Sequence, residues 1–188
     1  SMVTLSSIII AVPVGVIIGL FLGILSYKSE FLEKLISPVL DLMQTIPVFA
    51  YLVPILVMFG FGPVAALIAT IIYAMPPMVR TTLLALKSVN PQIKESGLMS
   101  GCTKRQLMWQ VLIPVSKPTL MIGVNQVIML SLNMVIIASM IGAGGLGYDV
   151  WQSLKQLRIG QGFEAGIAIT LVAIILDRLT YFCFPSYS

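Results

Sequence analysis

The sequence contains no histidine, only two cysteines and few charged residues, and each shortage excludes a class of protein. Of its 188 residues 10% are charged and 58% are hydrophobic, whereas soluble domains average about 25% charged residues. A water-soluble fold of this size would lack the polar residues to cover its surface. Cys102 and Cys183 lie far apart with no further ligand at metal-binding spacing, so we expect neither a metal site nor a disulfide.

The basic residues are scattered between apolar segments, although they give a formal net charge of +4. A nucleic-acid-binding surface would need a basic stripe interleaved with aromatic residues, so we expect no nucleic-acid partner. The pattern G-x-x-x-x-G-K-[ST] is also absent from the sequence. The chain therefore has no phosphate-binding loop of its own, and any ATP would have to bind a partner.

Long uncharged runs dominate the chain, and the mean hydropathy is +1.02. A run of about 20 apolar residues is long enough to cross a bilayer, and the first run covers residues 1–27. A signal peptide would need a basic segment before a shorter apolar core, so we interpret this run as a membrane span. We predict an all-α fold, a polytopic membrane helical bundle of about five transmembrane helices that forms a single domain over residues 1–188.

Charges and turn residues divide the remaining chain. Residues 28–41 alternate charged and apolar side chains, which is typical of an amphipathic interfacial turn. The uncharged run 42–79 is too long for one crossing, and Gly60-Phe61-Gly62-Pro63 splits it into a second and a third span. Span four is expected over 118–148, a short external helix over 149–161 and span five over 162–184.

Basic residues also predict the orientation, because loops rich in lysine and arginine stay in the cytoplasm. With the loops 28–41 and 81–117 inside, only Lys155 and Arg158 lie outside. The basic residues on the inner side are then Lys28, Lys34, Arg80, Lys87, Lys94, Lys104, Arg105, Lys117 and Arg178. We therefore expect a multi-pass protein of the cytoplasmic membrane with an external N-terminus.

The cytoplasmic loop, at about 87–117, carries strong local signals. Asn90-Pro91 is typical of a helix start, and the first helix is expected over residues 92–100. Gly101 should then turn the chain, because glycine adopts positive φ at little cost. Thr103 and Gln106 fit a capping box for a second helix to about residue 113, which Pro114 should end.

The first loop helix places the small residues Ser96 and Gly97 beside Glu95. Small residues next to a carboxylate suit a projection that inserts into a groove on another protein. An interfacial hairpin that merely covers the bundle is the alternative. In span one, Ala11, Gly15, Gly19 and Gly23 recur every four residues, which favours close helix packing.

The loop resembles the EAA loop of the permeases of binding-protein-dependent ABC importers. That motif reads E-A-A, three residues, G, nine residues, I-x-L-P. Here it is Glu95-Ser96-Gly97, Gly101 and Val111-Leu112-Ile113-Pro114, with serine and glycine for the alanines, valine for isoleucine and isoleucine for leucine. The resemblance implies that Glu95, Ser96, Gly97, Gly101 and Pro114 couple the chain to an ATPase.

Further segments resemble the branch that imports glycine betaine, proline betaine, choline or carnitine. They are Gln44-Thr45-Ile46-Pro47, Tyr73 to Arg80, Gly123-Val124-Asn125-Gln126, Met134 to Gly147 and Ile175 to Thr180. The resemblance implies the type I ABC importer permease fold, with no cofactor bound by this chain. It implies a cytoplasmic ABC ATPase subunit that holds ATP and Mg, an extracytoplasmic substrate-binding protein, and a second permease subunit, expected to be an identical copy, in the lipid bilayer.

Polar residues within spans are candidates for a translocation path, because a lipid-facing surface does not tolerate them. Hydrogen bonding that only holds helices together is the alternative for each. The candidates are Gln44, Thr45, Pro47, Asn125, Gln126, Asn133 and Ser139.

Two rival functions remain open: a permease for another small solute such as an amino acid, and a secondary transporter that works without ATP. Secondary transporters usually carry internal repeats or intramembrane carboxylates, whereas Asp41, Glu164 and Asp177 lie near span ends here. A membrane-embedded enzyme is disfavoured, since the sequence offers no histidine, cysteine pair or carboxylate dyad.

Overall fold

The computed structural model describes residues 2–139 and 144–183, and every regular element within these ranges is a helix. The all-α prediction is therefore confirmed for the described residues. The elements are α1 (Met2–Lys28), α2 (Glu30–Thr45), α3 (Val48–Phe59), α4 (Pro63–Lys87), α5 (Pro91–Met99), α6 (Lys104–Gln106), the π-helical η1 (Leu107–Leu112), α7 (Ile113–Ala138), α8 (Leu146–Lys155) and α9 (Ile159–Cys183). Part of the glycine-rich segment expected to close span four, 140–143, and part of the tail, 184–188, lie outside these residues.

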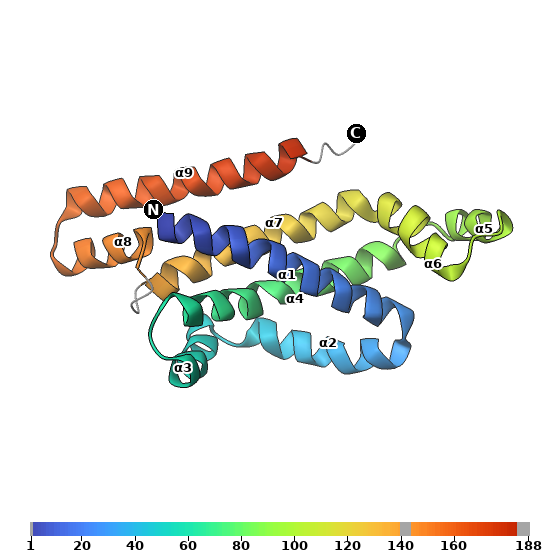
Figure 1. Ribbon diagram of the computed structural model, residues 1–188, viewed down its shortest axis with the longest axis horizontal. Helices are drawn as coiled ribbons and strands as arrows, with labels where there is room; N and C mark the ends of the chain where they lie inside the picture. Colours follow the sequence, from blue (N-terminus) through green and yellow to red (C-terminus); the bar gives the residue numbers. More distant parts are fainter. Residues whose placement is uncertain (1, 140–143, 184–188) are drawn as a thin grey trace.

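The long helices run side by side along one axis (Figure 1). Helices α1, α4 and α7 form the centre of the bundle, with α2 along one side and α9 along the other. Helices α5 and α6 project from one end, whereas α3 and α8 lie at the opposite end. Within the described residues, four helices are long and apolar enough to cross a membrane, or five if α2 and α3 are one broken span.

Glycine allows α1 and α4 to pack closely. A Cβ atom built on Gly19 would lie 2.6 Å from Met78 Cβ, and one on Gly23 would lie 2.5 Å from Thr82 Cβ. Gly123 of α7 makes a similar approach to α4, with its Cβ position 2.9 Å from Met78 Sδ. The packing role predicted for the small residues of span one is confirmed at Gly19 and Gly23.

The predicted boundaries of the second span are wrong. The charged stretch after Lys28 is no interfacial turn, because α2 begins directly at Glu30. The predicted turn from Gly60 to Pro63 is confirmed, since α3 ends at Phe59 and α4 begins at Pro63. The chain has a further break, not predicted, at Ile46-Pro47, where proline forces the preceding residue out of the helical region and Ile46 adopts φ −70°, ψ 129°. The axes of α2 and α3 differ by 98° across this break, and the Tyr51 hydroxyl donates to the Met43 carbonyl across it.

Pro114 does not end the second loop helix, contrary to the prediction. The chain is helical without interruption from Lys104 to Ala138. Proline removes one backbone donor from a helix. The π-helical turn η1 lies directly before Pro114, and at its end the Ile113 N–H bonds to Met108 O, five residues back. The wider π turn thus carries the helix past the proline, and the loop at about 87–117 continues directly into α7. This loop is called the coupling loop below, after the role that its resemblance to the EAA loop implies.

Candidate functional site

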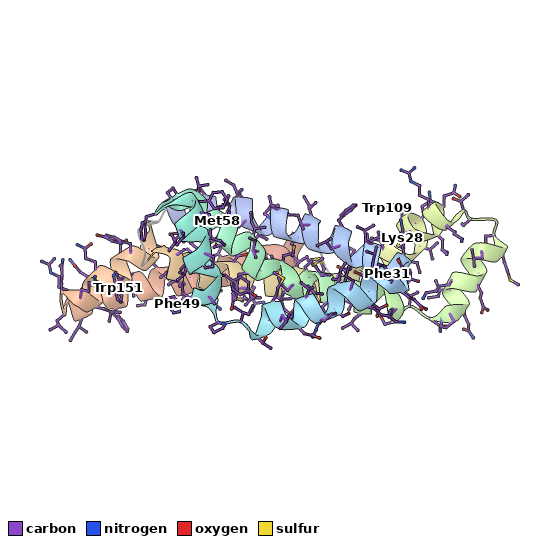
Figure 2. All side chains as sticks on the ribbon, turned by 90° about the horizontal axis from the view of Figure 1, so that it is seen from below. Lys28, Phe31, Phe49, Met58, Trp109 and Trp151 are labelled. Atoms are coloured by element: carbon purple, nitrogen blue, oxygen red, sulfur yellow. The ribbon has the colours of Figure 1, made fainter. Side chains whose placement is uncertain are left out.

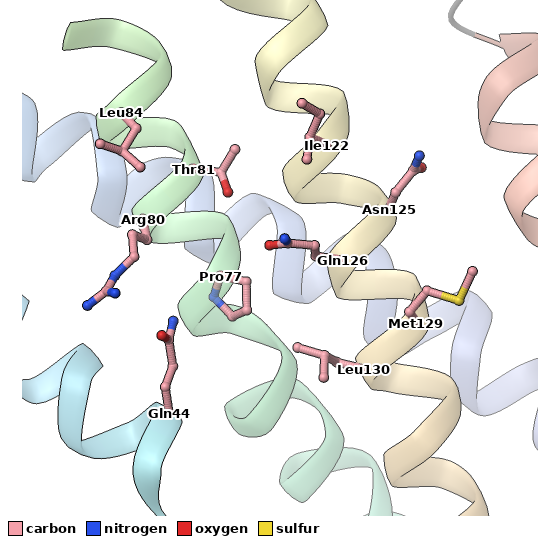
Figure 3. Close-up of a pocket in the computed structure, with 10 residues that line it drawn as sticks. All are labelled: Gln44, Pro77, Arg80, Thr81, Leu84, Ile122, Asn125, Gln126, Met129 and Leu130. Carbon is pink, nitrogen blue, oxygen red and sulfur yellow. The ribbon is translucent and has the colours of Figure 1, made fainter. Parts of the chain in front are cut away.

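A groove of about 750 Å³, lined by both apolar and polar side chains, opens on the bundle between the C-terminal half of α2, α4 and α7. Residues 77, 80, 81 and 84 of α4 and residues 122, 125, 126, 129 and 130 of α7 line it. These positions follow the spacing of a single helix face, so each helix turns one face to the groove. Figure 3 shows Gln126 reaching from α7 toward α4, and Gln44 reaching from α2 toward Arg80.

An ion pair bounds the groove on the α2 side. The Arg80 guanidinium donates to the Asp41 carboxylate, which joins α4 to α2. The two side chains are 42% and 61% exposed, so the pair is accessible and its net stabilising energy is small. An accessible pair of this kind is able to open and offer the guanidinium to a carboxylate in the groove.

The structure brings three of the predicted path residues together and separates the others. Gln44, Asn125 and Gln126 line the groove. Thr45 is exposed and bonds to Leu42 O, while Pro47 caps α3 beyond the break.

Two predicted path residues on α7 lie outside the groove. Asn133 is exposed, one turn beyond Met129 on the same face of the helix. Ser139 is buried, and its hydroxyl donates to Val135 O at 2.6 Å, which fits the structural alternative. Arg80 and Thr81 line the groove but were missed as path candidates, although a charge directly after an uncharged run was a signal.

The coupling loop is a helix, a glycine turn and a second capped helix, as predicted. The Asn90 side chain accepts a bond from the Gln92 N–H. At the end of α5, the Cys102 N–H bonds to Gly97 O and the Gly101 N–H bonds to Leu98 O. This pair of bonds is a Schellman motif, and it places Gly101 at φ +80°.

Thr103 begins the second helix of the loop. Its hydroxyl oxygen accepts from the Gln106 N–H at 3.3 Å, and the Gln106 side-chain oxygen accepts from the Thr103 N–H at 2.9 Å. The predicted capping box is therefore confirmed. Because the side chains of the loop satisfy these end groups, the loop keeps a defined shape at the end of the bundle.

Gly97 does not point outward, contrary to the expectation that it would meet a partner's groove. Its Cβ position would lie 2.6 Å from Leu107 Cδ1 and 3.7 Å from Val111 Cγ2, so Gly97 faces the second helix of its own loop. The outer face of α5 instead carries Glu95, Ser96 and Met99, all exposed, and Met99 is 90% exposed. This face is uncovered among the described residues.

The loop is packed onto the ends of the long helices. Met108 and Leu112 form a buried cluster with Ile24 of α1 and Leu86 of α4. Close by, the Lys94 ammonium lies 5.4 Å from the centroid of the Tyr27 ring, a distance typical of a cation–π contact. A displacement of the loop would therefore be passed to α1, α4 and α7 together.

The described part of the chain thus combines helices long and apolar enough to cross a membrane, a packed, projecting loop and a groove that carries polar side chains. The chain matches the family "Binding-protein-dependent transport system inner membrane component" over residues 15–185. This match covers most of the chain, and the protein belongs to that family. The predicted family is therefore confirmed.

Two curated relatives are similar to nearly the whole chain. The trimethylamine N-oxide transport system permease protein TmoV of Pelagibacter ubique is 47% identical over 96% of this chain. The glycine betaine/carnitine transport permease protein GbuB of Listeria monocytogenes is 48% identical over 94% of it. The chain spans 25% of the length of TmoV and 63% of the length of GbuB.

Among solved structures, the inward-facing MetNI methionine ABC transporter includes a similar chain. The similarity has a TM-score of 0.79 and covers 97% of this chain and 89% of that one, at 24% sequence identity. It shows a common fold, and the predicted type I ABC importer permease fold is confirmed.

Proposed function

We propose that this chain is the membrane-spanning permease subunit of an ATP-driven importer for a compact methylated zwitterion. The observation that carries the proposal is the coupling loop, whose two capped helices project from the bundle yet pack on α1 and α4. A loop that only covered the bundle would not need an uncovered outer face. Family membership supports the same function.

In the proposed mechanism, the outer face of α5 docks into a groove on a cytoplasmic ATPase subunit, which binds ATP and Mg. Glu95, Ser96 and Met99 would form this contact, since they are exposed on one face of α5. Gly97 and Gly101 act inside the loop. Gly97 lets α5 lie against Leu107, and Gly101 sets the angle between the two loop helices.

Closure of the ATPases would then push the loop, and the buried cluster beneath it would transmit the movement. Met108 and Leu112 belong to the same helix as α7, and their neighbours Ile24 and Leu86 belong to α1 and α4. These three helices would tilt as one unit between inward-facing and outward-facing states. Pro114 lies at the junction of loop and span, where it would pass the stroke into α7 without ending the helix.

The groove between α2, α4 and α7 is the proposed half of the translocation path, and a second identical permease would supply the other half. Gln44, Thr81 and Gln126 offer amide and hydroxyl groups to a solute that leaves water. Arg80 would exchange Asp41 for the negative end of the solute. Thr45, Pro47, Asn125, Asn133 and Ser139 would act at the edges of this path or hold the helices around it.

The substrate class is inferred from the relatives. TmoV and GbuB are named for trimethylamine N-oxide and for glycine betaine and carnitine. These solutes share a methylated, positively charged nitrogen and a negatively charged oxygen, which in trimethylamine N-oxide is bonded directly to the nitrogen. Glycine betaine, proline betaine, carnitine and trimethylamine N-oxide are therefore the solutes to test first. Choline shares the methylated nitrogen but has no negative oxygen, so it is tested beside them. An external binding protein would select among these solutes, as aromatic cages do for quaternary ammonium groups.

The basic residues favour a cytoplasmic position for the coupling loop and an external N-terminus. In the structure, α1, α4 and α9 run toward the end that carries the loop, while α2 and α7 run away from it (Figure 1). The end with α5 and α6 would therefore face the ATPase in the cytoplasm. The end with α8 would face the substrate-binding protein.

Uptake of radiolabelled glycine betaine and trimethylamine N-oxide in proteoliposomes tests the function. The permease is reconstituted with its neighbouring ATPase and binding protein, with ATP inside. We expect uptake that requires ATP and the ATPase and that fails with an ATPase lacking hydrolysis. Uptake that continues without ATP would contradict the proposal and favour a secondary transporter.

A further inference from the structure

A second groove, distinct from the groove between α2, α4 and α7, lies where the end of α1 meets the coupling loop. It measures about 700 Å³. Lys28, Lys104 and Arg105 supply three positive charges to its lining, and Tyr27, Met108 and Trp109 supply apolar surface. The proposed transport mechanism uses none of the three charges.

These cations have no carboxylate partner in the part of the chain that the structure describes, where the two ion pairs are Arg80–Asp41 and Lys87–Glu33. Lys104 and Arg105 also occupy the first turn of a helix, where the helix dipole disfavours positive charge. Cations that line one groove without a counter-charge repel one another. An anion in the groove would remove this repulsion.

Exposed aromatic side chains surround the same place. Trp109 is 57% exposed and Phe31 is 75% exposed, and Figure 2 shows both at the end of the molecule that carries Lys28. Lys28 is also the first charge after the uncharged run of α1. Aromatic and basic side chains at the end of an apolar span are typical of the depth at which lipid headgroups lie.

We propose that this groove binds the phosphate of an anionic phospholipid. Lys28, Lys104 and Arg105 would hold the phosphate, while an acyl chain would lie along the exposed Trp109 and the partly exposed Leu107. A lipid fits better than the ATPase subunit, because the groove includes Tyr27 and Lys28 at the end of the apolar run of α1 and the exposed ring of Trp109. Basic pockets beside spans on the cytoplasmic side bind such headgroups.

A bound lipid would also act on the coupling loop. Tyr27 lines the groove and contacts Lys94 of α5 at 5.4 Å, while Met108 belongs to the buried cluster under the loop. An anionic headgroup would therefore join the end of α1 to both loop helices. Membrane charge would then stabilise the arrangement through which the stroke passes.

Native mass spectrometry of the detergent-purified permease, together with any co-purifying subunits, tests the proposal. The probes are palmitoyl-oleoyl phosphatidylglycerol, phosphatidylcholine with the same chains, and inorganic phosphate. We expect tighter retention of phosphatidylglycerol than of phosphatidylcholine. Since each cation near a lipid surface changes affinity about five-fold, Lys104→Gln/Arg105→Gln should weaken phosphatidylglycerol binding about 20- to 30-fold.

The opposite end of the molecule supplies a matched control, Lys155→Gln/Arg158→Gln, which should leave phosphatidylglycerol binding unchanged. Lys104→Arg/Arg105→Lys keeps both positive charges and should also leave phosphatidylglycerol binding unchanged. Equal losses in the two glutamine pairs, or equal retention of both lipids, would overturn the proposal.

Two further results would identify a different occupant and overturn the lipid site. Displacement of phosphatidylglycerol by inorganic phosphate would indicate a free-anion site, and loss of the ATPase subunit from Lys104→Gln/Arg105→Gln would indicate a protein contact. The measurement does not depend on transport, so absence of uptake would count only against the proposed function.

Discussion

Gly23→Ala should destabilise the bundle, because its new methyl group would meet atoms that cannot move aside. The Cβ position lies 2.5 Å from Thr82 Cβ and 2.9 Å from Val79 O, whereas carbon atoms rest at about 3.5 to 4.0 Å. Rotation of the threonine side chain moves neither its Cβ nor a backbone carbonyl. Helices α1 and α4 would therefore have to separate by about 1 Å near this point.

Overpacking of this kind costs about 1 to 3 kcal/mol, and a clash with fixed atoms falls at the upper end. Replacing a helical glycine with alanine returns about 1 kcal/mol, which leaves a net loss of about 2 kcal/mol. Gly15→Ala is the matched control on the same helix, because its Cβ would lie 3.5 Å from Val127 Cγ1, in ordinary contact. The control should be neutral or slightly stabilising.

The assay is unfolding of the purified permease in mixed micelles by increasing fractions of SDS, followed by circular dichroism. Gly23→Ala should unfold at a lower SDS fraction than the wild type, and Gly15→Ala should not. Identical midpoints for the two variants would refute the close approach of α1 and α4 and the packing role of this glycine.

Three further outcomes are expected. Gly101→Val should abolish uptake without preventing membrane insertion, since valine at φ +80° is strained by about 1 to 2 kcal/mol. Gly101→Asn should keep most of the uptake, because asparagine tolerates this φ. Equal uptake by the two variants would be evidence against a functional role of the turn at Gly101. A cysteine at Gly62 should react with an impermeant thiol reagent from outside and one at Lys104 only after permeabilisation, and the reverse pattern would invert the topology. Gln126→Leu should reduce uptake more than Asn133→Leu, because only Gln126 lines the groove, and equal effects would place the path elsewhere.

Local signals in the sequence predicted the coupling loop well. Asn90, Gly101 and Thr103 act through bonds to residues within five positions in the chain, so their roles depend little on the rest of the fold. The hydrophobic runs predicted four of the five spans, all but the second, for the same reason, since each helix satisfies its own backbone groups in lipid.

Features that depend on neighbouring helices were not predicted. The direction of Gly97 follows from the packing of Leu107 against α5, which the spacing of small residues does not reveal. Pro114 was expected to end a helix, but the π turn before it carries the helix onward. The place of Arg80 in the groove depends on α2 lying beside α4. The turn at Gly60 to Pro63 was predicted and is present, but the break at Pro47, which separates α2 from α3, was not predicted.

The central claim, that the outer face of α5 receives the ATPase stroke, is tested most directly by Ser96→Trp. Ser96 is exposed on that face, and serine and tryptophan have similar helix propensities, so the bulky side chain should block docking while α5 stays folded. Gln156→Trp, exposed at the opposite end, is the control. The measurement is co-purification of the ATPase subunit together with ATP-driven uptake in proteoliposomes. Loss of both in Ser96→Trp, with both retained in Gln156→Trp, is the predicted result, and normal co-purification and uptake in Ser96→Trp would contradict it.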